Sequence, residues 1–298
     1  MRIARSIVEA RTAVRELRAG GGRTIGLVPT MGALHEGHLS LVRAARAGCD
    51  VVVVSLFVNP AQFGPNEDFA KYPRTFDADC GQLAGEGVSL VFAPPVEEMY
   101  SPGASTFVDV EGVSERLDGA SRPGHFRGVA TVVAKLFHVV GPNRAFFGQK
   151  DAAQIAVLRK MVRDLNFPVE LVVCPIVREP DGLAMSSRNA FLTREERGRA
   201  LVLQRALREV SRLAADGVTA AQDLIAAAEA ILALEPGVRV DYCRVVDADT
   251  LEDVPDVREG ALVAVAALVG STRLIDNLDL PSRHLRDSPS RHTRSAPS

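Results

Sequence analysis

Residues 24–38, TIGLVPTMGALHEGH, decide the fold of this chain. The apolar run at residues 24–28 predicts a buried strand, and the turn at residues 29–32 ends it. His35 and His38 then open an apolar-periodic segment, so both imidazoles are expected on one face of a helix's first turn. Free backbone N–H groups in such a turn favour anions. The stretch therefore predicts a phosphate site, with two incidental histidines at a helix start as the alternative.

Short β-branched runs alternate with helical patterns on both sides of this stretch. Such alternation is typical of βαβ units and predicts a doubly wound parallel sheet, a Rossmann-like α/β fold. The expected strands are residues 24–28, 50–58, 88–92, 144–147 and 169–173, and the expected helices are residues 2–19, 37 onward, 131–140 and 152–164.

The pattern changes after Pro175. Thr193 with Glu196, and Thr219 with Gln222, are capping-box patterns that predict helices at residues 194–215 and 220–234. Strands are expected at 239–246, 261–269 and near 272–275. These elements form a second, smaller α+β domain. The expected division is residues 1–177 for the Rossmann-like domain, 178–280 for the smaller lid domain, and 281–298 for a disordered tail.

Composition limits the classes of function. The chain has 298 residues, 47% of them hydrophobic and 24% charged, with a formal net charge of −2. These values are typical of a soluble globular protein without a polyanion-binding surface, so no nucleic acid partner is expected. Four scattered cysteines without a C-x-x-C pair indicate reduced thiols, and no run of about 18 apolar residues predicts a membrane span. A cytoplasmic protein is expected, with no membrane association.

Two further segments carry groups suited to phosphate chemistry. Met185-Ser186-Ser187-Arg188 lies in a polar loop, where hydroxyls and a guanidinium can close over a pyrophosphate leaving group. Gly148-Gln149-Lys150-Asp151 lies at a strand-to-helix turn, where Asp151 can cap the helix and Lys150 can reach the phosphate cavity of His38. The alternatives are an ordinary surface loop and a solvated lysine. Together with H-x-G-H, the first segment matches the signature of α/β nucleotidyl transferases.

Carboxamide side chains form the last group of candidates. Asn59 and Gln62 follow the expected strand at residues 50–58, and Gln154 lies one turn into the helix at residues 152–164. Carboxamides both donate and accept hydrogen bonds, so they suit a small ligand with hydroxyls beside a carboxylate. Each of them is a structural amide in the alternative interpretation.

These motifs together resemble the pantoate–β-alanine ligase family, and the match runs in order from about residue 1 to Asn277. The blocks that carry it are residues 29–38, residues 57–63, Tyr72-Pro73-Arg74-Thr75, residues 122–128, residues 148–151 and Met185-Ser186-Ser187-Arg188-Asn189. The resemblance implies a two-step ligation. The carboxylate of pantoate attacks the α-phosphate of ATP and releases pyrophosphate, and the amine of β-alanine then attacks the pantoyl adenylate and releases AMP.

The resemblance also implies roles for individual residues, and a homodimer. His38 is the implied proton donor, and Gln62 and Gln154 hold pantoate, with Gln62 also near β-alanine. The expected catalytic residues are His35, His38, Lys150, Ser186, Ser187 and Arg188. The expected ATP site adds Met31, Gly32, Ala33, Leu34, Glu36, Gly37, Gly148, Gln149, Asp151, Val177 and Met185, and the expected substrate residues are Gln62, Gln154, Asn59 and His125.

Three side chains stay open at this stage. Mg²⁺ is expected with ATP, and Asp79 is a candidate ligand because it lies in an acidic patch of the family; a solvated acid at a helix start is the alternative. His125 either holds a substrate carboxylate or packs beside the pocket. His138, in an apolar run, is expected to be a satisfied core histidine.

Two other functions compete with the ligase. Another adenylate-forming enzyme or nucleotidyl transferase of the superfamily shares the phosphate motifs, although the near-neutral charge and the lack of an anticodon-binding extension disfavour an aminoacyl-tRNA synthetase. A non-catalytic nucleotide-binding regulator is the alternative from a different class. It predicts the loss of at least one catalytic element, whereas His35, His38, Lys150, Ser186 and Arg188 are all present.

Overall fold

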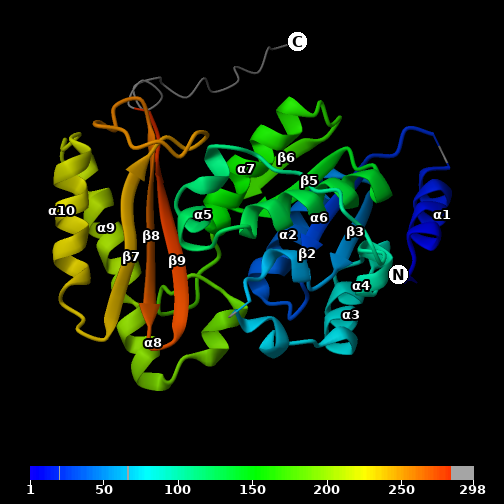
Figure 1. The fold of residues 1–298 in the computed structure, drawn as a ribbon, viewed down its shortest axis with the longest axis horizontal. Coiled ribbons are helices and arrows are strands. Elements are labelled where there is room, and N and C mark those ends of the chain that lie inside the picture. The colour runs from blue at the N-terminus through cyan, green and yellow to red at the C-terminus, as the bar shows by residue number, and fades with distance from the viewer. Residues whose placement is uncertain (20, 66, 283–298) are drawn as a thin grey trace, which may run out of the picture.

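The computed structural model describes residues 1–19, 21–65 and 67–282, so residues 283–298 of the expected tail lie outside the described residues. A parallel sheet of six strands forms the larger part (Figure 1). Its spatial order is β1-β4-β3-β2-β5-β6. The strands are β1 (Arg2–Ala4), β2 (Ile25–Thr30), β3 (Val51–Leu56), β4 (Leu90–Phe92), β5 (Arg144–Gly148) and β6 (Glu170–Cys174).

Helices cover both faces of this sheet, as the doubly wound prediction requires. Side chains of β3 alternate between two hydrophobic clusters: Val51 and Val53 pack with α1, α6 and α7, whereas Val52 and Val54 pack with α2 and α3. The helices are α1 (Ile7–Arg18), α2 (Glu36–Gly48), α3 (Phe76–Gly85), α4 (Val96–Met99), α5 (Asp118–Ser121), α6 (His125–Val140) and α7 (Ala152–Asp164). Short 3₁₀ helices lie at Pro60–Gln62, Asp68–Lys71, Val113–Glu115 and Gln149–Asp151.

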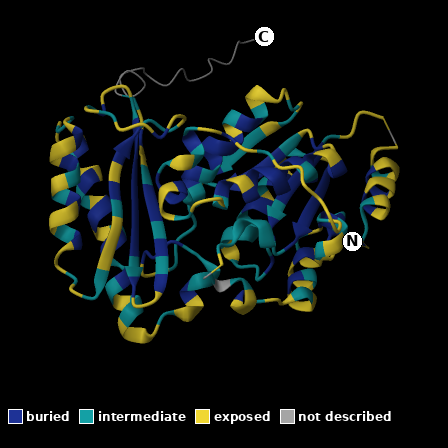
Figure 2. Cartoon of the chain, viewed as in Figure 1, coloured by how far each residue is buried: buried dark blue, intermediate teal, exposed yellow. Residues whose placement is uncertain are grey.

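The second part is an antiparallel sheet in the order β7-β8-β9, with three helices. Its elements are α8 (Arg194–Ala200), α9 (Val202–Ala215), α10 (Ala221–Leu232), β7 (Val238–Val246), β8 (Ala261–Val269) and β9 (Thr272–Leu280), and a fifth 3₁₀ helix lies at Ser187–Phe191. Val263 and Val265 of β8 pack on α9 and α10, whereas Leu262 and Ala264 join the core of the first domain. The sheet is therefore sandwiched between its helices and the parallel-sheet domain, and β8 is buried along nearly its whole length (Figure 2).

Several predicted boundaries were wrong. The helix expected at residues 2–19 begins only at Ile7, where Ser6 and Glu9 form a capping box, because residues 2–4 pair with β4 as an edge strand. The helix expected at 194–215 divides at Leu201 into α8 and α9. The capping box of Thr193 and Glu196 is confirmed. That of Thr219 is wrong, because Ala220 occupies the N-cap of α10 without a side-chain bond.

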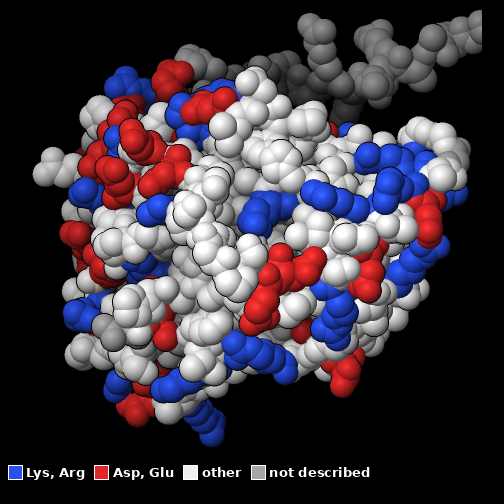
Figure 3. Space-filling model, turned by 45° about the vertical axis from the view of Figure 1, so that its right-hand side comes forward, with Lys and Arg blue, Asp and Glu red and all other residues white. Residues whose placement is uncertain are grey.

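The described surface carries both signs of charge. On the face drawn in Figure 3, Lys and Arg side chains are interspersed with Asp and Glu, so no single-sign field dominates that face. No helix within the described ranges combines the length and the apolar character that crossing a membrane requires.

His138 differs from the prediction. It is exposed on α6 instead of lying in the core, and its ring lies at 5.3 Å from the ring of Phe167. The surrounding apolar run belongs to the buried face of α6, and residue 138 falls on the other face of the same helix.

Candidate active site at the sheet switch point

The order of the parallel strands reverses between β2 and β5. From β2 the chain winds outward through β3 and β4, whereas β5 and β6 extend from the opposite side of β2. In open α/β sheets, the crevice beyond the carboxyl ends of the strands at such a point binds ligands. The H-x-G-H segment follows β2 and Lys150 follows β5, so the fold brings the two predicted phosphate motifs to one place.

The two histidines begin α2. His35 takes the N-cap position in an extended conformation, and its backbone N–H donates to Nδ1 of His38 at 3.3 Å. The ring centroids lie 4.1 Å apart. Because Nδ1 of His38 accepts, the single proton of its neutral ring is on Nε2. Burial, followed by the neighbouring His35 ring, lowers the pKa of His38 to about 3. The ring is therefore neutral near pH 7 and presents an Nε2–H donor.

Gly37 is required by the position of the His35 ring. A Cβ at residue 37 would lie 2.9 Å from Cε1 of His35 and 3.0 Å from its Nδ1. Within the described residues, His35 Nδ1 is a buried polar atom without a hydrogen-bond partner. A buried unpaired imidazole nitrogen costs free energy unless a ligand or water meets it. The ring is therefore held close over the start of α2 with a polar atom free to bind a ligand.

The turn before the helix is held by Asp79. Gly32 and Ala33 both have positive φ, 83° and 50°. The N–H groups of Ala33 and Leu34 donate to the two oxygens of Asp79 at 3.0 and 2.9 Å, and the Thr75 hydroxyl adds a third bond. The backbone N–H groups of residues 33 and 34 are therefore already bonded to Asp79. The place of Ala33 and Leu34 in the ATP site stays a prediction.

The same geometry bears on the metal expectation for Asp79. Its side chain is 2% exposed, so the alternative of a solvated acid is wrong. Its oxygens already accept three hydrogen bonds from the protein. Over the part of the chain that the structure describes, no three His, Cys, Asp or Glu side chains form a group that could hold a metal ion. The site thus offers no protein cage for Mg²⁺.

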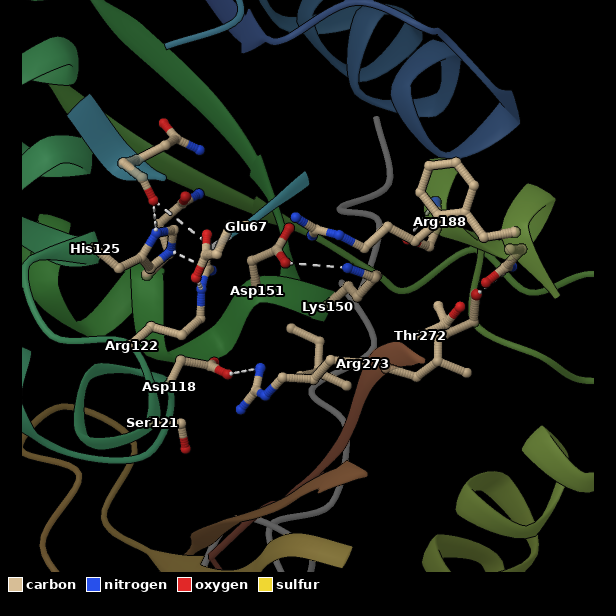
Figure 4. Close-up of a pocket in the computed structure, with 18 of the residues that line it drawn as sticks. Glu67, Asp118, Ser121, Arg122, His125, Lys150, Asp151, Arg188, Thr272 and Arg273 are labelled. Carbon is tan, nitrogen blue, oxygen red and sulfur yellow. Dashed lines mark hydrogen bonds and ion pairs between the residues drawn. The ribbon is translucent and has the colours of Figure 1, made fainter. Parts of the chain in front are cut away.

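Lys150 and Asp151 form an ion pair at the start of α7. The Nζ–Oδ1 distance is 3.1 Å. Burial acts to raise the pKa of Asp151, but the charge and hydrogen bond of Lys150, together with the nearby Arg188, outweigh burial, so this pKa lies below the usual range. Asp151 occupies the N-cap position without capping the helix, so that part of the prediction was wrong. Its carboxylate orients Lys150 instead. Figure 4 shows Arg188 extending toward the same pair.

The loop at residues 178–189 carries the hydroxyls and the guanidinium. Ser186 caps the 3₁₀ helix Ser187–Phe191 by accepting from the Arg188 N–H at 3.3 Å, and the Ser187 hydroxyl lies 3.2 Å from Tyr72 Oη. Glu179 accepts from Nδ2 of Asn189 at 2.8 Å and from Arg197 of α8 at 2.5 Å. The loop is therefore fixed from inside and tied to the C-terminal domain.

Asn59 and Gln62 lie just beyond the carboxyl end of β3. Gln62 accepts from Nδ2 of Asn59 at 3.0 Å and donates to Sδ of Met31. Asn59 is 1% exposed and also contacts the Gly128 carbonyl and the hydroxyl of Tyr100. Asn59 therefore positions Gln62 from behind, because its own polar atoms are all used inside the protein. The expectation of a direct substrate contact by Asn59 does not fit this geometry.

His125 has both ring nitrogens engaged. Nδ1 donates to the Gln62 carbonyl at 2.8 Å, and Nε2 accepts from Arg122 at 3.0 Å. Burial, with the Arg122 guanidinium beside it, lowers the pKa of His125 to about 4. Arg122 in turn holds Glu67 with two hydrogen bonds of 2.7 and 2.6 Å. This network favours packing beside the pocket over a direct hold on a substrate carboxylate.

One cavity of about 890 Å³ joins several of these groups, but His35, His38 and Asn59 are not among its lining residues. Its lining includes Gln62 and Gln154. In Figure 4, Lys150, Asp151 and Arg188 lie together at one end of the cavity, and Arg122 and Asp118 lie toward the other. Ser186, Glu67 and Arg273 also line it. A second cavity of about 450 Å³ lies beside the first end, against His35, Asp79 and Ser187. The site therefore lies between the two sheets, with contributions from both parts of the chain.

Four more predicted ATP residues, Glu36, Gly148, Gln149 and Val177, are not among the lining residues of these two cavities. Gly148 ends β5 without a neighbour within 4 Å of a Cβ, and the Val177 carbonyl accepts from the Met185 N–H at 3.0 Å. The side chain of Glu36 forms an ion pair with Arg43 on the surface, so only the backbone of Glu36 is available to a ligand at the N-terminus of α2. Gln149 donates to Asn277. These placements are compatible with a nucleotide site, which stays a prediction at the level of single residues.

Sequence reasoning missed the residues that brace the site. Glu67, Arg178 and Glu179 form ion pairs around it, and Asp276 and Asn277 reach it from β9. The last two are adjacent polar residues that interrupt the apolar sequence of β9 between Ile275 and Leu278. That interruption was the available signal.

The switch-point crevice, the paired histidines and the hydroxyl-guanidinium loop define an enzyme of the α/β nucleotidyl transferase class. Within that class, the family model described as Pantoate-beta-alanine ligase matches residues 2–279. The chain belongs to the pantoate–β-alanine ligase family.

Relatives agree with this assignment. A pantothenate synthetase of Acidobacterium capsulatum is 65% identical over 288 residues, covering 93% of this chain and 96% of the relative. One of Koribacter versatilis is 61% identical over 280 residues, covering 94% and 96%. The crystal structure of pantothenate synthetase from Thermus thermophilus has a TM-score of 0.89 at 48% identity and covers 94% of this chain and 99% of its own. The Francisella tularensis pantoate-beta-alanine ligase, complexed with beta-gamma ATP and beta-alanine, has a TM-score of 0.77 at 32% identity, covering 94% and 97%.

Proposed function

We propose that this enzyme condenses pantoate with β-alanine at the expense of ATP, giving pantothenate, AMP and pyrophosphate through a pantoyl adenylate. One observation carries the proposal: a single cavity joins the Lys150–Arg188 end to the Gln62–Gln154 carboxamides. An adenylation site needs cationic donors for a leaving pyrophosphate next to a pocket for a small hydroxy acid. Family membership supports the same reaction.

In the first step, a carboxylate oxygen of pantoate bonds to the α-phosphorus of ATP, and the bond to the bridging oxygen of pyrophosphate breaks. Lys150, Ser186, Ser187 and Arg188 stabilise the charge that moves onto the leaving group. Preorganised donors of this kind are each worth about 10²–10³ in rate. Gln62 and Gln154 hold pantoate through its hydroxyls and carboxylate.

His38 acts in this proposal through its Nε2–H. A ring whose pKa is about 3 carries no acidic proton near neutral pH, so it donates a hydrogen bond to a phosphate oxygen and keeps its proton. The implied proton-donor role therefore requires that bound phosphate raise this pKa by several units. Beside His38, the unpartnered Nδ1 of His35 donates a hydrogen bond to the ligand or accepts one from it.

In the second step, the amine of β-alanine bonds to the acyl carbon, AMP leaves, and the amine loses a proton. Mg²⁺ accompanies ATP in this proposal and neutralises phosphate charge. Mg²⁺ keeps several waters and needs only one or two carboxylates, which agrees with the absence of a three-residue metal cage in the described part of the chain.

We further propose a homodimer, as the family resemblance implies, and a cytoplasmic location. The four cysteines are free thiols in the structure, as expected in a reducing compartment. Sedimentation analysis of the purified chain tests the dimer, which a monomer at micromolar concentration contradicts.

The deciding experiment measures pyrophosphate and AMP released from ATP, with pantoate and β-alanine added singly and together. Pantoate alone should give one equivalent of pyrophosphate and an enzyme-bound adenylate, and both substrates should give multiple turnovers. Turnover with an unrelated carboxylate but none with pantoate would contradict the proposal. It would favour a different adenylate-forming enzyme.

A further inference from the structure

Two adjacent buried residues of β9, Asp276 and Asn277, contact two different parts of the active site. Their exposures are 4% and 5%. Successive side chains of a strand point to opposite faces, so the two reach separate partners. Neither has a role in the reaction as proposed above, and both belong to the C-terminal sheet.

Asn277 holds the segment that carries Lys150. Its Nδ2 donates to the carbonyls of Gln149 and Lys150, both at 2.9 Å, and its Oδ1 accepts from Nε2 of Gln149 at 3.2 Å. A side chain with two N–H donors on one atom is needed to meet both carbonyls, and a carboxylate cannot do so. The backbone position of Lys150 therefore depends on a residue from the other sheet.

Asp276 holds the base of the loop that carries Ser186, Ser187 and Arg188. Its two oxygens accept from Nη1 and Nη2 of Arg178 at 2.6 and 2.9 Å. Such a two-point pair fixes both the distance and the plane of the guanidinium. Arg178 also donates to the Gly182 carbonyl at 3.2 Å, within the same loop. The carboxylate of Asp276 additionally accepts from the N–H of Asn277 at 2.8 Å, which couples the two residues.

We propose that Asp276 and Asn277 are positioning residues that set Lys150 against the Ser186–Arg188 loop, the two sides of the pyrophosphate clamp. The inference rests on the proposed function, since it assumes that these groups stabilise the leaving pyrophosphate. The clamp is assembled from two separate segments, and β9 is the element that contacts both. A shift of about 1 Å in such a group can cost about 10² in rate.

The test separates the two half-reactions. Pantoate-dependent exchange of labelled pyrophosphate into ATP reports adenylation, and single-turnover attack of β-alanine on the enzyme-bound adenylate reports the second step. Asn277→Ala should lower the exchange rate about 10- to 100-fold, with a smaller change in the KM of ATP, because the clamp acts on charge that develops in the transition state. The second step, in which AMP leaves, should change less than about threefold.

A double variant tests whether Asn277 acts through Lys150. Lys150→Ala alone should slow exchange, and adding Asn277→Ala should slow it by less than about threefold more, because residues that share one function are not additive. A full multiplicative loss would overturn the proposal. So would equal losses in both half-reactions, which a general folding defect predicts.

Two more variants keep the result interpretable. Asp276→Asn removes the two-point charge pair with little change in shape and should slow exchange selectively in the same way; it carries the test should Asn277→Ala not fold. Asp279→Asn, at an exposed position of the same strand, should leave both half-reactions unchanged. Wild-type enzyme without pantoate-dependent exchange would contradict the proposed function itself. If exchange is normal in the wild-type enzyme and unaffected in Asn277→Ala and Asp276→Asn, only the positioning role is contradicted.

Discussion

Gly128 of α6 is the position where one added methyl group should do most damage to substrate binding. A Cβ built there lies 2.1 Å from the Ala61 carbonyl oxygen, 2.4 Å from its carbon and 2.6 Å from the Gln62 nitrogen. All three are backbone atoms, so no side-chain rotation relieves the collision. To reach an ordinary contact, the 3₁₀ helix Pro60–Gln62 has to retreat from α6 by about 1.3 Å. Gln62, at the end of that helix, has to move with it.

Gly128→Ala should therefore raise the KM of pantoate and lower kcat, together by about 10²-fold in kcat/KM. The same retreat stretches the bond from Nδ2 of Asn59 to the Gly128 carbonyl, now 3.1 Å. Overpacking of this kind costs about 1–3 kcal/mol of stability, partly offset by about 1 kcal/mol from the better helix propensity of alanine. Steady-state kinetics and urea denaturation measure the two effects.

Gly81→Ala is the matched control. Gly81 is also inside a helix, α3, but a Cβ there has no neighbour within 4 Å. This variant should gain the helix-propensity term and keep its kinetics. If Gly128→Ala has wild-type kcat and KM, the close approach of α6 to Pro60–Gln62 does not position Gln62, and the reasoning about the carboxamide pocket fails.

Three more predictions follow from the site. His38→Asn keeps an acceptor near the Nδ1 position but loses the Nε2–H, so it should slow pyrophosphate release about 10²–10³-fold. His38→Gln keeps a donor near the Nε2 position, so its loss of rate should be smaller. Equal losses of rate in the two variants would contradict the assigned tautomer. Asp79→Asn should raise the KM of ATP about tenfold, because hydrogen bonds to a charged acceptor are worth about 1.5–3 kcal/mol. The Mg²⁺ concentration that gives half-maximal rate should stay unchanged. A large shift in that concentration would favour the metal-ligand role of Asp79. The pKa of His125 is lowered to about 4 in the folded protein against about 6.5 when unfolded, so the unfolded chain binds more protons between these values and stability should fall as the pH drops from about 6.5 to 4. His125→Asn should show a shallower loss in urea denaturation at pH 7.5 and 5, and an equally steep one would show that other groups cause it.

Local sequence patterns predicted helices and strands best where the hydrophobic periodicity was strong and the element did not depend on pairing with a distant segment. The β-branched run of β3 indicated a strand buried on both faces, and the structure confirms it because each of Val51–Val54 packs against helices. Residues 2–4 could not be predicted as a strand. Three residues carry no periodicity, and only pairing with β4, almost ninety residues away, makes them extended.

The candidate site divides in the same way. H-x-G-H and the segments around Lys150 and Ser186 could be found because each combines unusual residue types with a strand-to-helix or loop context. Asp79 was noticed as an acid, but its partners are the backbone N–H groups of Ala33 and Leu34, more than forty residues away. Its bracing role follows from that long-range contact, which spacing along the chain does not encode.

What the sequence by itself determined is the α/β fold and the family, because those depend on hydrophobic period and on short motifs whose chemistry is local. What only the tertiary structure decided is how those motifs meet and what state their side chains take. His38 is neutral because burial removes water from its ring. Lys150 is placed by Asn277 because β9 packs against the 3₁₀ helix Gln149–Asp151 that carries Lys150. Burial and contact across more than a hundred residues are properties of the folded chain, and they set the electrostatics on which the chemistry depends.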